Sequence, residues 1–430
     1  MMRVLLNVIC AGLLSFCLPT WGQNVLSYPQ LPAAESGGNA LLPKMSAFHA
    51  PEQDVARAER VRNAWKVEPV PVPLTRLMLD MFVKHKMAPS RGARGSALVH
   101  VAMHDAFELA AGQKLDQRLT VAAAASRVFG YLFPNEEGAF DRMADQLMVK
   151  AIRESGPAFQ AQLTQSVLLG RHVGDAVVDY ADKDGAQRGW NALRLEYYGQ
   201  HRYYGPGTWE PTPPYFYYPP DEPFAPQWRP WVLSSASEFR AVPLEYGSKA
   251  YLDELREVVE VGASLTDEQR RIAHFWVDGH GSVTPTGHWN QIAMDAVLQS
   301  RMNDRSAVRL GMILNLALAD SFIAAWDTKY HYWTTRPVTA APELLGISFT
   351  PAILTPPFPS FVSGHACTSG AAGEILAEFF PNKARQFRAM AQQAADSRLY
   401  GGIHFRHDNE SGLEMGRNVA RKALSTYPVR

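Results

Sequence analysis

The stretch that decides the fold is AVRLGMILNLALADSFIAAWDTKYHYW, residues 307–333. Its apolar side chains recur at intervals of three and four residues, which is the period of an α-helix with a buried face. The apolar run Leu310–Trp326 approaches the length that spans a bilayer, but it contains Asn315 and Asp320. We therefore expect a buried helix of a soluble protein without a membrane span, and this helix leads directly into a group of charged residues.

The same helical period extends over most of the chain on both sides of this stretch. Two series of helical segments, residues 55–189 and 233–430, are separated by residues 190–232, where Tyr, Trp and Pro are dense. Proline lacks an amide donor and buried aromatic rings need cover, so the middle segment is predicted to be an ordered, non-helical crossover. It is either a wall of a site or packing between the two series. The predicted fold class is all-α, with two packed helical bundles.

The N-terminal residues have the pattern of a secretory signal peptide. Arg3 precedes an apolar run and a polar turn, so residues 1–23 are predicted to be removed on export to the periplasm or the medium. Residues 24–54 are rich in Pro, Gly, Ser and Ala and predict a flexible leader. After cleavage Cys367 is the remaining cysteine, which excludes an intramolecular disulfide and a thiolate metal site.

The charge balance argues against a nucleic-acid partner. The chain has 42 basic and 42 acidic residues and a net charge of zero, whereas proteins that bind phosphate backbones usually carry a basic surplus. Any anion must therefore be bound by a local group of cations.

One histidine pattern has the spacing of a metal site. His100, His104 and Glu108 lie at i, i+4 and i+8, on one face of a helix that a zinc ion could use. The intervening residues are apolar and His100 has no adjacent glutamate to act as a hydrolytic base, so we interpret these histidines as hydrogen-bonded core residues. Three other histidines lack ligand spacing and are assigned structural or supporting roles: His274, His280 and His288.

Three short motifs between residues 326 and 408 carry the chemistry, and the first holds two cations. Lys329 precedes Arg336 by seven residues, or about two helical turns, so both would share one face if the helix continued. Pro337 would then end or bend the chain. Two cations on one face repel each other unless an anion lies between them, and the surrounding aromatic residues indicate a partly buried setting in which charges need partners.

The second motif is PFPSFVSGHA, residues 357–366. Ser363 and Gly364 stand just before a helix that is expected to begin near Ala366. The free amides and the dipole of a helix N-terminus favour an oxyanion there, and glycine lets the anion come close. His365 has a near-neutral reference pKa and could donate or accept a proton at that anion.

The third motif is SRLYGGIHFRHD, residues 397–408, and it adds a third cation, Arg398. Asp408 follows His404 by four residues, so a helical segment would let the carboxylate accept the second N–H of the imidazole. That contact fixes the tautomer and raises the basicity of the other nitrogen. Together the three motifs predict an oxyanion site with two histidines available for chemistry.

These motifs resemble those of the vanadium-dependent haloperoxidases, which share a superfamily with bacterial acid phosphatases and type 2 phosphatidic acid phosphatases. The superfamily pattern is K-x6-R-P, then P-S-G-H, then S-R-x5-H-x3-D. The chain departs from it at Val362, which stands where the pattern has proline; the Pro-Ser pair lies instead at Pro359 and Ser360. This looks like a variant of the loop.

The resemblance implies a role for each motif residue. His404 would be the axial ligand to vanadium, with Asp408 behind it. His365 would be the acid–base residue, paired with Asp278. The oxygens of vanadate would be held by Lys329, Arg336, Ser363, Gly364 and Arg398. The halide side of the pocket would be lined by Trp326 and Phe358.

The predicted activity is the oxidation of a halide by hydrogen peroxide to hypohalous acid, with vanadate as the cofactor. The alternative is a phosphohydrolase in which phosphate occupies the same oxyanion site and His404 forms a phosphohistidine. A third interpretation, a non-catalytic oxyanion binder, gives no reason for both His365 and His404. The aromatic pair suits halide and peroxide better than a bulky phosphoester. The choice of halide and the oligomeric state stay open.

Overall fold

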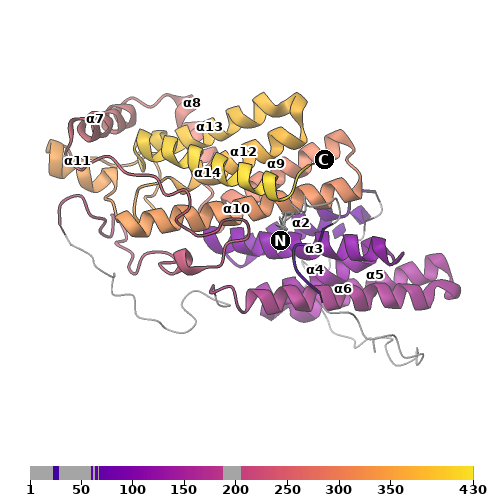
Figure 1. Cartoon of the computed structure of the whole chain (residues 1–430). Coiled ribbons are helices and arrows are strands. Elements are labelled where there is room, and N and C mark those ends of the chain that lie inside the picture. The colour runs from indigo at the N-terminus through magenta and orange to yellow at the C-terminus, as the bar shows by residue number, and fades with distance from the viewer. Residues whose placement is uncertain (1–22, 29–59, 62, 66, 187–204, 430) are drawn as a thin grey trace, which may run out of the picture.

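The computed structural model describes residues 23–28, 60–61, 63–65, 67–186 and 205–429, and this part of the chain is all-α (Figure 1). Its one β feature is an isolated antiparallel bridge between Thr208 and Thr334. The first group of helices is α2 (Pro71–Lys84), α3 (Pro89–Gly112), α4 (Gln117–Leu132), α5 (Glu137–Ser155) and α6 (Gln160–Ala181). The second group is α7 (Lys249–Ala263), α8 (Asp267–Phe275), α9 (Thr284–Ser300), α10 (Asp304–Tyr332), α11 (Pro337–Leu345), α12 (Gly364–Phe379), α13 (Ala384–Tyr400) and α14 (Arg406–Thr426). The predicted fold class is confirmed.

Helix α10 lies at the centre of the molecule. It packs on α3 of the first group and on α12 and α14 of the second, so it forms the seam between them (Figure 1). By length and composition it passes the test for a membrane span, but 94% of its most apolar window is buried inside the protein. Such burial is typical of a core helix, because the apolar faces of both groups of helices need cover.

The described part of the crossover, residues 205–232, is non-helical apart from a single turn, Ala225–Gln227. Its C-terminal end is fixed to α10 by Asp320, whose carboxylate accepts hydrogen bonds from the backbone N–H groups of residues 231, 232 and 233. Glu222 binds Arg91 of α3. The crossover is thus held by both groups of helices, as expected, while its residues 190–204 lie outside the described part.

The predicted signal peptide, apart from Gln23, and most of the predicted leader lie outside the described residues. Residues 24–28, assigned to a flexible leader, are instead fixed against α3. The buried carboxylate of Asp105 accepts hydrogen bonds from the amides of Val25 and Leu26 and from the hydroxyl of Tyr28. A buried carboxylate needs such donors, and the side chains of Val25, Leu26 and Tyr28 also pack against the core, which explains why this stretch is held in place. The limits 55–189 and 233–430 of the two bundles stay predictions.

The suspected zinc face on α3 is a pair of hydrogen-bonded core histidines. The ring of His100 contacts the carbonyl of Ser96 and the hydroxyl of Thr75, and burial lowers its pKa to about 4. His104 is hydrogen-bonded to Asp105. Among the described residues there is no group of three or more ligands able to hold a metal ion.

Glycines bring α12 and α14 into close contact. A Cβ atom at Gly412 would lie 2.6 Å from the carbonyl oxygen of Ser363, and one at Gly416 would lie 1.9 Å from that of Cys367. These are distances that real Cβ atoms do not adopt, so glycine permits the approach. The start of α12 therefore lies against α14, and the amide of Ser363 donates to the carbonyl of Asp408 at 3.0 Å, which joins the second and third motifs.

The structure corrects the predicted geometry of the first motif. Helix α10 ends at Tyr332, and Trp333 has a left-handed conformation with φ 56°. Arg336 is the N-cap residue of α11, and Pro337 occupies the first position of that helix rather than ending one. Lys329 and Arg336 therefore share a site because a turn brings them together, and not because they share a helical face.

Candidate active site

Several segments that are far apart in the sequence meet at the C-terminal end of α10 to form the candidate site. The three cations come from α10, from the start of α11 and from the last turn of α13, and the loop 357–362 passes between them. The three side chains are nearly inaccessible to solvent: Lys329, Arg336 and Arg398. The spacing of the motifs predicted this set, and the fold brings all of it together.

Backbone carbonyls hold each cation in place. Lys329 Nζ donates to the carbonyls of Pro359 and Ser360, at 2.9 and 2.7 Å. Arg336 donates from Nε to the carbonyl of Phe358, at 2.9 Å, and from Nη1 to that of Ile403, at 2.8 Å. The carbonyls fix the side chains without cancelling their charge.

Burial destabilises the charged form of all three cations. It lowers the pKa of Arg336 to about 9 and that of Arg398 to about 10. The pKa of Lys329 is also lowered, first by burial and then by the charge of Arg336. Buried cations of one sign need an anion, because desolvation and mutual repulsion both act against them.

Three buried nitrogen atoms of this site have no hydrogen-bond partner among the described residues: Arg336 Nη2, Arg398 Nε and His365 Nε2. An unpaired buried polar atom costs about 1–3 kcal/mol, so three in one site indicate a missing hydrogen-bonding ligand. Two guanidinium groups, an ammonium group and a helix N-terminus are the donors that bind a tetrahedral or trigonal oxyanion. The residues present therefore fit vanadate and fit phosphate equally well.

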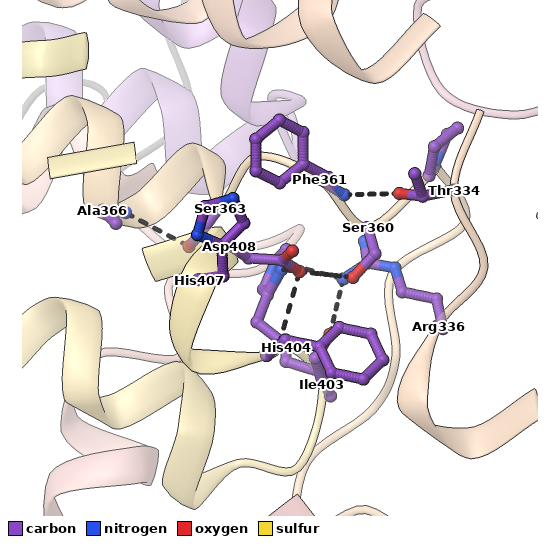
Figure 2. A network of polar contacts seen from close by, with 12 residues as sticks. Thr334, Arg336, Ser360, Phe361, Ser363, Ala366, Ile403, His404, His407 and Asp408 are labelled. Atoms are coloured by element: carbon purple, nitrogen blue, oxygen red, sulfur yellow. Dashed lines mark hydrogen bonds and ion pairs between the residues drawn. The ribbon is translucent and has the colours of Figure 1, made fainter. Parts of the chain in front are cut away.

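His404 is held as a neutral imidazole (Figure 2). Its Nδ1 lies 2.8 Å from Asp408 Oδ2, and Arg336 Nη1 donates to its Nε2 at 3.1 Å. A guanidinium can only donate, so Nε2 is the unprotonated nitrogen and the proton is on Nδ1. Burial, followed by the charge of Arg336, lowers the pKa of His404. Nε2 thus has the lone pair that a ligand or a nucleophile needs.

Ser360 has a role that was not predicted from the sequence. Its hydroxyl donates to Asp408 Oδ2 at 2.6 Å, and so it orients the carboxylate that orients His404 (Figure 2). Burial raises the pKa of Asp408, while the bond from Ser360 opposes that shift. The displaced Pro359-Ser360 pair was the available signal. His404 lies two residues before α14, yet the predicted contact with Asp408 forms.

The second motif places its residues at the start of α12, two positions earlier than expected. Ser363 is the N-cap, and its hydroxyl oxygen accepts from the amide of Ala366 at 3.3 Å, which leaves the O–H free to donate to an anion. A Cβ atom at Gly364 would lie 3.3 Å from the ring of Trp326. The backbone at Gly364 therefore closely approaches the aromatic wall.

His365 lies in the site but is not paired with Asp278 as predicted. Asp278 instead contacts His288, with Nδ1 3.0 Å from Oδ2. The ring of His365 is hydrogen-bonded to the backbone of Trp276, and burial followed by the charge of Arg398 lowers its pKa. The reason is that Asp278 follows Trp276 in a turn directed toward α9, where His288 lies.

Two aromatic rings form one side of the site. The centroids of Trp326 and Phe358 are 5.0 Å apart, and both Lys329 Nζ and Arg336 Cζ lie 5.1 Å from the centroid of Phe358. Trp326 Nε1 donates to the carbonyl of Asp221, at 3.1 Å, so the crossover supports this wall. Sequence reasoning found the two rings but not the backbone contact that fixes one of them.

The fold and site define a class of protein: a protein of two helical bundles with a buried oxyanion cradle, which is formed by Lys329, Arg336 and Arg398. Residues 309–386 and 381–428 match the family model of the VCPO second helical-bundle domain. A crystal structure of a bacterial vanadium-dependent iodoperoxidase is similar, with a TM-score of 0.68, 25% identity, and coverage of 89% of this chain and 98% of that chain.

Two crystal structures of bacterial vanadium-dependent chloroperoxidase share the fold. The holo form has a TM-score of 0.60 at 16% identity, covering 79% of this chain and 92% of that chain. The apo form has a TM-score of 0.63 at 15% identity, covering 79% and 95%. No curated protein sequence matches the chain. The resemblance to the vanadium-dependent haloperoxidase family is confirmed by the domain match and the structural neighbours.

Proposed function

We propose that this protein is a vanadium-dependent haloperoxidase that oxidises a halide with hydrogen peroxide to hypohalous acid. The observation that carries the proposal is the buried cradle of three cations around His404, whose Nε2 is unprotonated and accepts a hydrogen bond from Arg336. Support comes from the iodoperoxidase structure, which is 25% identical to this chain and matches 89% of the length of this chain.

In this proposal the cradle binds and polarises an oxyanion. Lys329, Arg336 and Arg398 would hold vanadate through its oxygens, with Ser363 and the start of α12 as neutral donors. Bound vanadate supplies a Lewis-acidic centre that activates hydrogen peroxide without a change of its oxidation state. His404 would ligate it through Nε2, and the contact with Asp408 keeps that nitrogen unprotonated.

His365 would move the protons of the reaction. Its pKa is lowered by burial, so at neutral pH it is a free base able to accept a proton from hydrogen peroxide. Trp326 and Phe358 form one side of the site and would exclude water from a halide bound against them. Iodide is the first halide to test, because the more similar of the structural neighbours compared is an iodoperoxidase.

A phosphohydrolase is the alternative that one observation favours. The unprotonated Nε2 of His404 beside an oxyanion cradle would also suit attack on phosphorus. The aromatic wall supports the haloperoxidase over the phosphohydrolase, because it offers an apolar, polarisable surface where a phosphoester would need room for its alcohol.

The test is to load the purified protein with vanadate and to measure peroxide-dependent oxidation of iodide, bromide and chloride. Phosphoester hydrolysis is measured in parallel without vanadate. We expect halide oxidation that His404→Ala abolishes. Phosphoester hydrolysis without halide oxidation under any condition would reverse the assignment.

We also propose export of the protein, from the pattern of residues 1–23. N-terminal sequencing of the protein recovered from the periplasm or the medium should begin near residue 23. A protein recovered only from the cytoplasm with its first residues intact would contradict this proposal.

A further inference from the structure

Asp278 and His288 form a hydrogen-bonded pair beside the oxyanion cradle. Nδ1 of His288 lies 3.0 Å from Oδ2 and 3.2 Å from Oδ1 of Asp278. The side chains of His288 and Asp278 are 12% and 8% exposed, so the pair lies between the buried cradle and the solvent. A carboxylate that accepts the N–H of an imidazole fixes its tautomer and leaves the other nitrogen able to exchange a proton.

Trp276 links this pair to the site. The ring of His288 stacks on that of Trp276, with centroids 4.4 Å apart and an interplanar angle of 24°. The carbonyl of Trp276 accepts a hydrogen bond from Arg398 Nη1 at 2.7 Å, and the ring of His365 is bonded to the same backbone. One residue therefore contacts the outer histidine, the inner histidine and one cation of the cradle.

The two histidines are also coupled electrostatically. The positive charge of His288 lowers the pKa of His365, in addition to burial and the charge of Arg398. The charged and titratable groups around this coupling come from four elements: Asp278 in the turn after α8, His288 on α9, Arg398 on α13 and Lys329 on α10. Protonation of the outer histidine thus favours loss of a proton from the inner one.

The proposed reaction needs protons from solvent. Hydrogen peroxide and a halide ion give hypohalous acid and hydroxide: the O–O bond breaks, an O–halogen bond forms, and the halide gives up two electrons. One proton then converts hydroxide to water, so each turnover consumes a proton. His365 Nε2 is buried and has no hydrogen-bond partner within the described residues. A proton that His365 gives up must therefore be replaced through another group.

We infer that Asp278 and His288 form a second acid–base pair that passes protons between the solvent and His365. The inference rests on the proposed haloperoxidase activity. His288 acts through His365 and does not touch the oxyanion, so it is a positioning and relay residue. Asp278 keeps the imidazole of His288 oriented, and Trp276 contacts His288 through its ring and His365 through its backbone.

The first test compares His288→Gln with His280→Gln in the vanadate-loaded protein. His280 is a matched control, because it also contacts a carboxylate, Asp221 at 3.2 Å, but is 53% exposed. We expect His288→Gln to lower kcat for iodide oxidation about tenfold or more, with KM for iodide and peroxide unchanged. Added imidazole should restore the rate of this variant, and His280→Gln should behave as wild type.

The second test needs no activity. In the vanadate-free protein, histidine ¹⁵N chemical shifts are followed against pH for wild type, His288→Gln and His288→Asn. Loss of the positive charge should raise the pKa of His365 in both variants, and circular dichroism should show that they are folded. His280→Gln should leave the pKa of His365 unchanged.

An unchanged titration of His365 in folded His288 variants, or a loss of rate that imidazole does not restore, would overturn the inference. Failure of the wild-type protein to oxidise any halide would remove the proposed function instead. The titration of His365 would then decide by itself whether the two histidines are coupled.

Discussion

At the scale of single residues, the site depends on cationic side chains that donate hydrogen bonds to backbone carbonyls. Carbonyls are neutral, so they hold these side chains in place without neutralising their positive charge. Arg336 is the clearest case. Two of its nitrogens donate to carbonyls, Nη1 also reaches His404, and Nη2 has no partner in the described part of the chain. The planar guanidinium can do all of this at once, whereas the ammonium group of a lysine cannot.

Arg336→Lys should therefore weaken oxyanion binding while the protein stays folded. We expect the affinity for vanadate and for phosphate to fall by about tenfold to a hundredfold, equivalent to about 1.4–2.8 kcal/mol. Calorimetric titration with each anion measures the change. Arg406→Lys is the control, because Arg406 is exposed and pairs with Glu257. Equal affinities for wild type and Arg336→Lys would show that this guanidinium does not bind the anion.

Ser360→Ala should reduce catalysis through Asp408. The variant loses the 2.6 Å hydrogen bond to Oδ2, so the carboxylate is less well oriented and His404 less well held. We expect kcat for halide oxidation to fall by about tenfold and stability by about 1 kcal/mol. Steady-state kinetics and urea unfolding measure the two effects. A variant with full activity would assign Ser360 a purely structural role.

At the scale of helices, the glycines between α12 and α14 set the distance between the second and third motifs. The carbonyls of α12 lie where the Cβ atoms of α14 would otherwise be. The apolar period of either helix alone does not predict this close contact. The contact matters because the N-terminal ends of these helices carry His365 and His404 with its partner Asp408.

Gly416→Ala should separate these helices. The new Cβ would meet the carbonyl of Cys367 at 1.9 Å, so the backbone must shift at a cost of about 1–3 kcal/mol or more. Thermal unfolding should show a lower midpoint, and activity should fall as the two motifs move apart. Gly112→Ala, where a Cβ would meet nothing within 4 Å, should not destabilise the protein. Equal losses in both variants would refute the packing argument.

At the scale of the whole molecule, α10 joins the two groups of helices and holds the crossover. Asp320 on this helix accepts three backbone N–H groups of the crossover. Burial nevertheless raises its pKa to about 6. The carboxylate is therefore a pH-sensitive connection between α10 and the segment that supports the aromatic wall.

The contribution of Asp320 to stability should fall as the pH rises. Its pKa is about 6 in the folded protein and 3.8 for a fully solvated aspartate, so the folded state binds the proton more tightly than the unfolded state. Between about pH 4 and pH 6 the free energy of unfolding should decrease by up to about 3 kcal/mol from this group. Urea unfolding of wild type and Asp320→Asn gives the difference at each pH. A difference that grows with pH would contradict the raised pKa.

Much of this molecule could be predicted because its signals are local. The apolar period of α10 and its neighbours determined the helical class, and the spacing within three motifs identified the cations, His365, His404 and Asp408. Helical period and motif spacing act over a few residues, so they are present in the chain before it folds.

Only the tertiary structure decided which groups meet across long separations of sequence. Ser360 reaches Asp408 across 48 residues, and the carbonyl of Trp276 binds Arg398 across 122. The partner of Asp278 proved to be His288, because a turn directs the carboxylate toward α9. Such contacts depend on the packing of whole helices and on backbone carbonyls, which every residue possesses and no sequence pattern distinguishes.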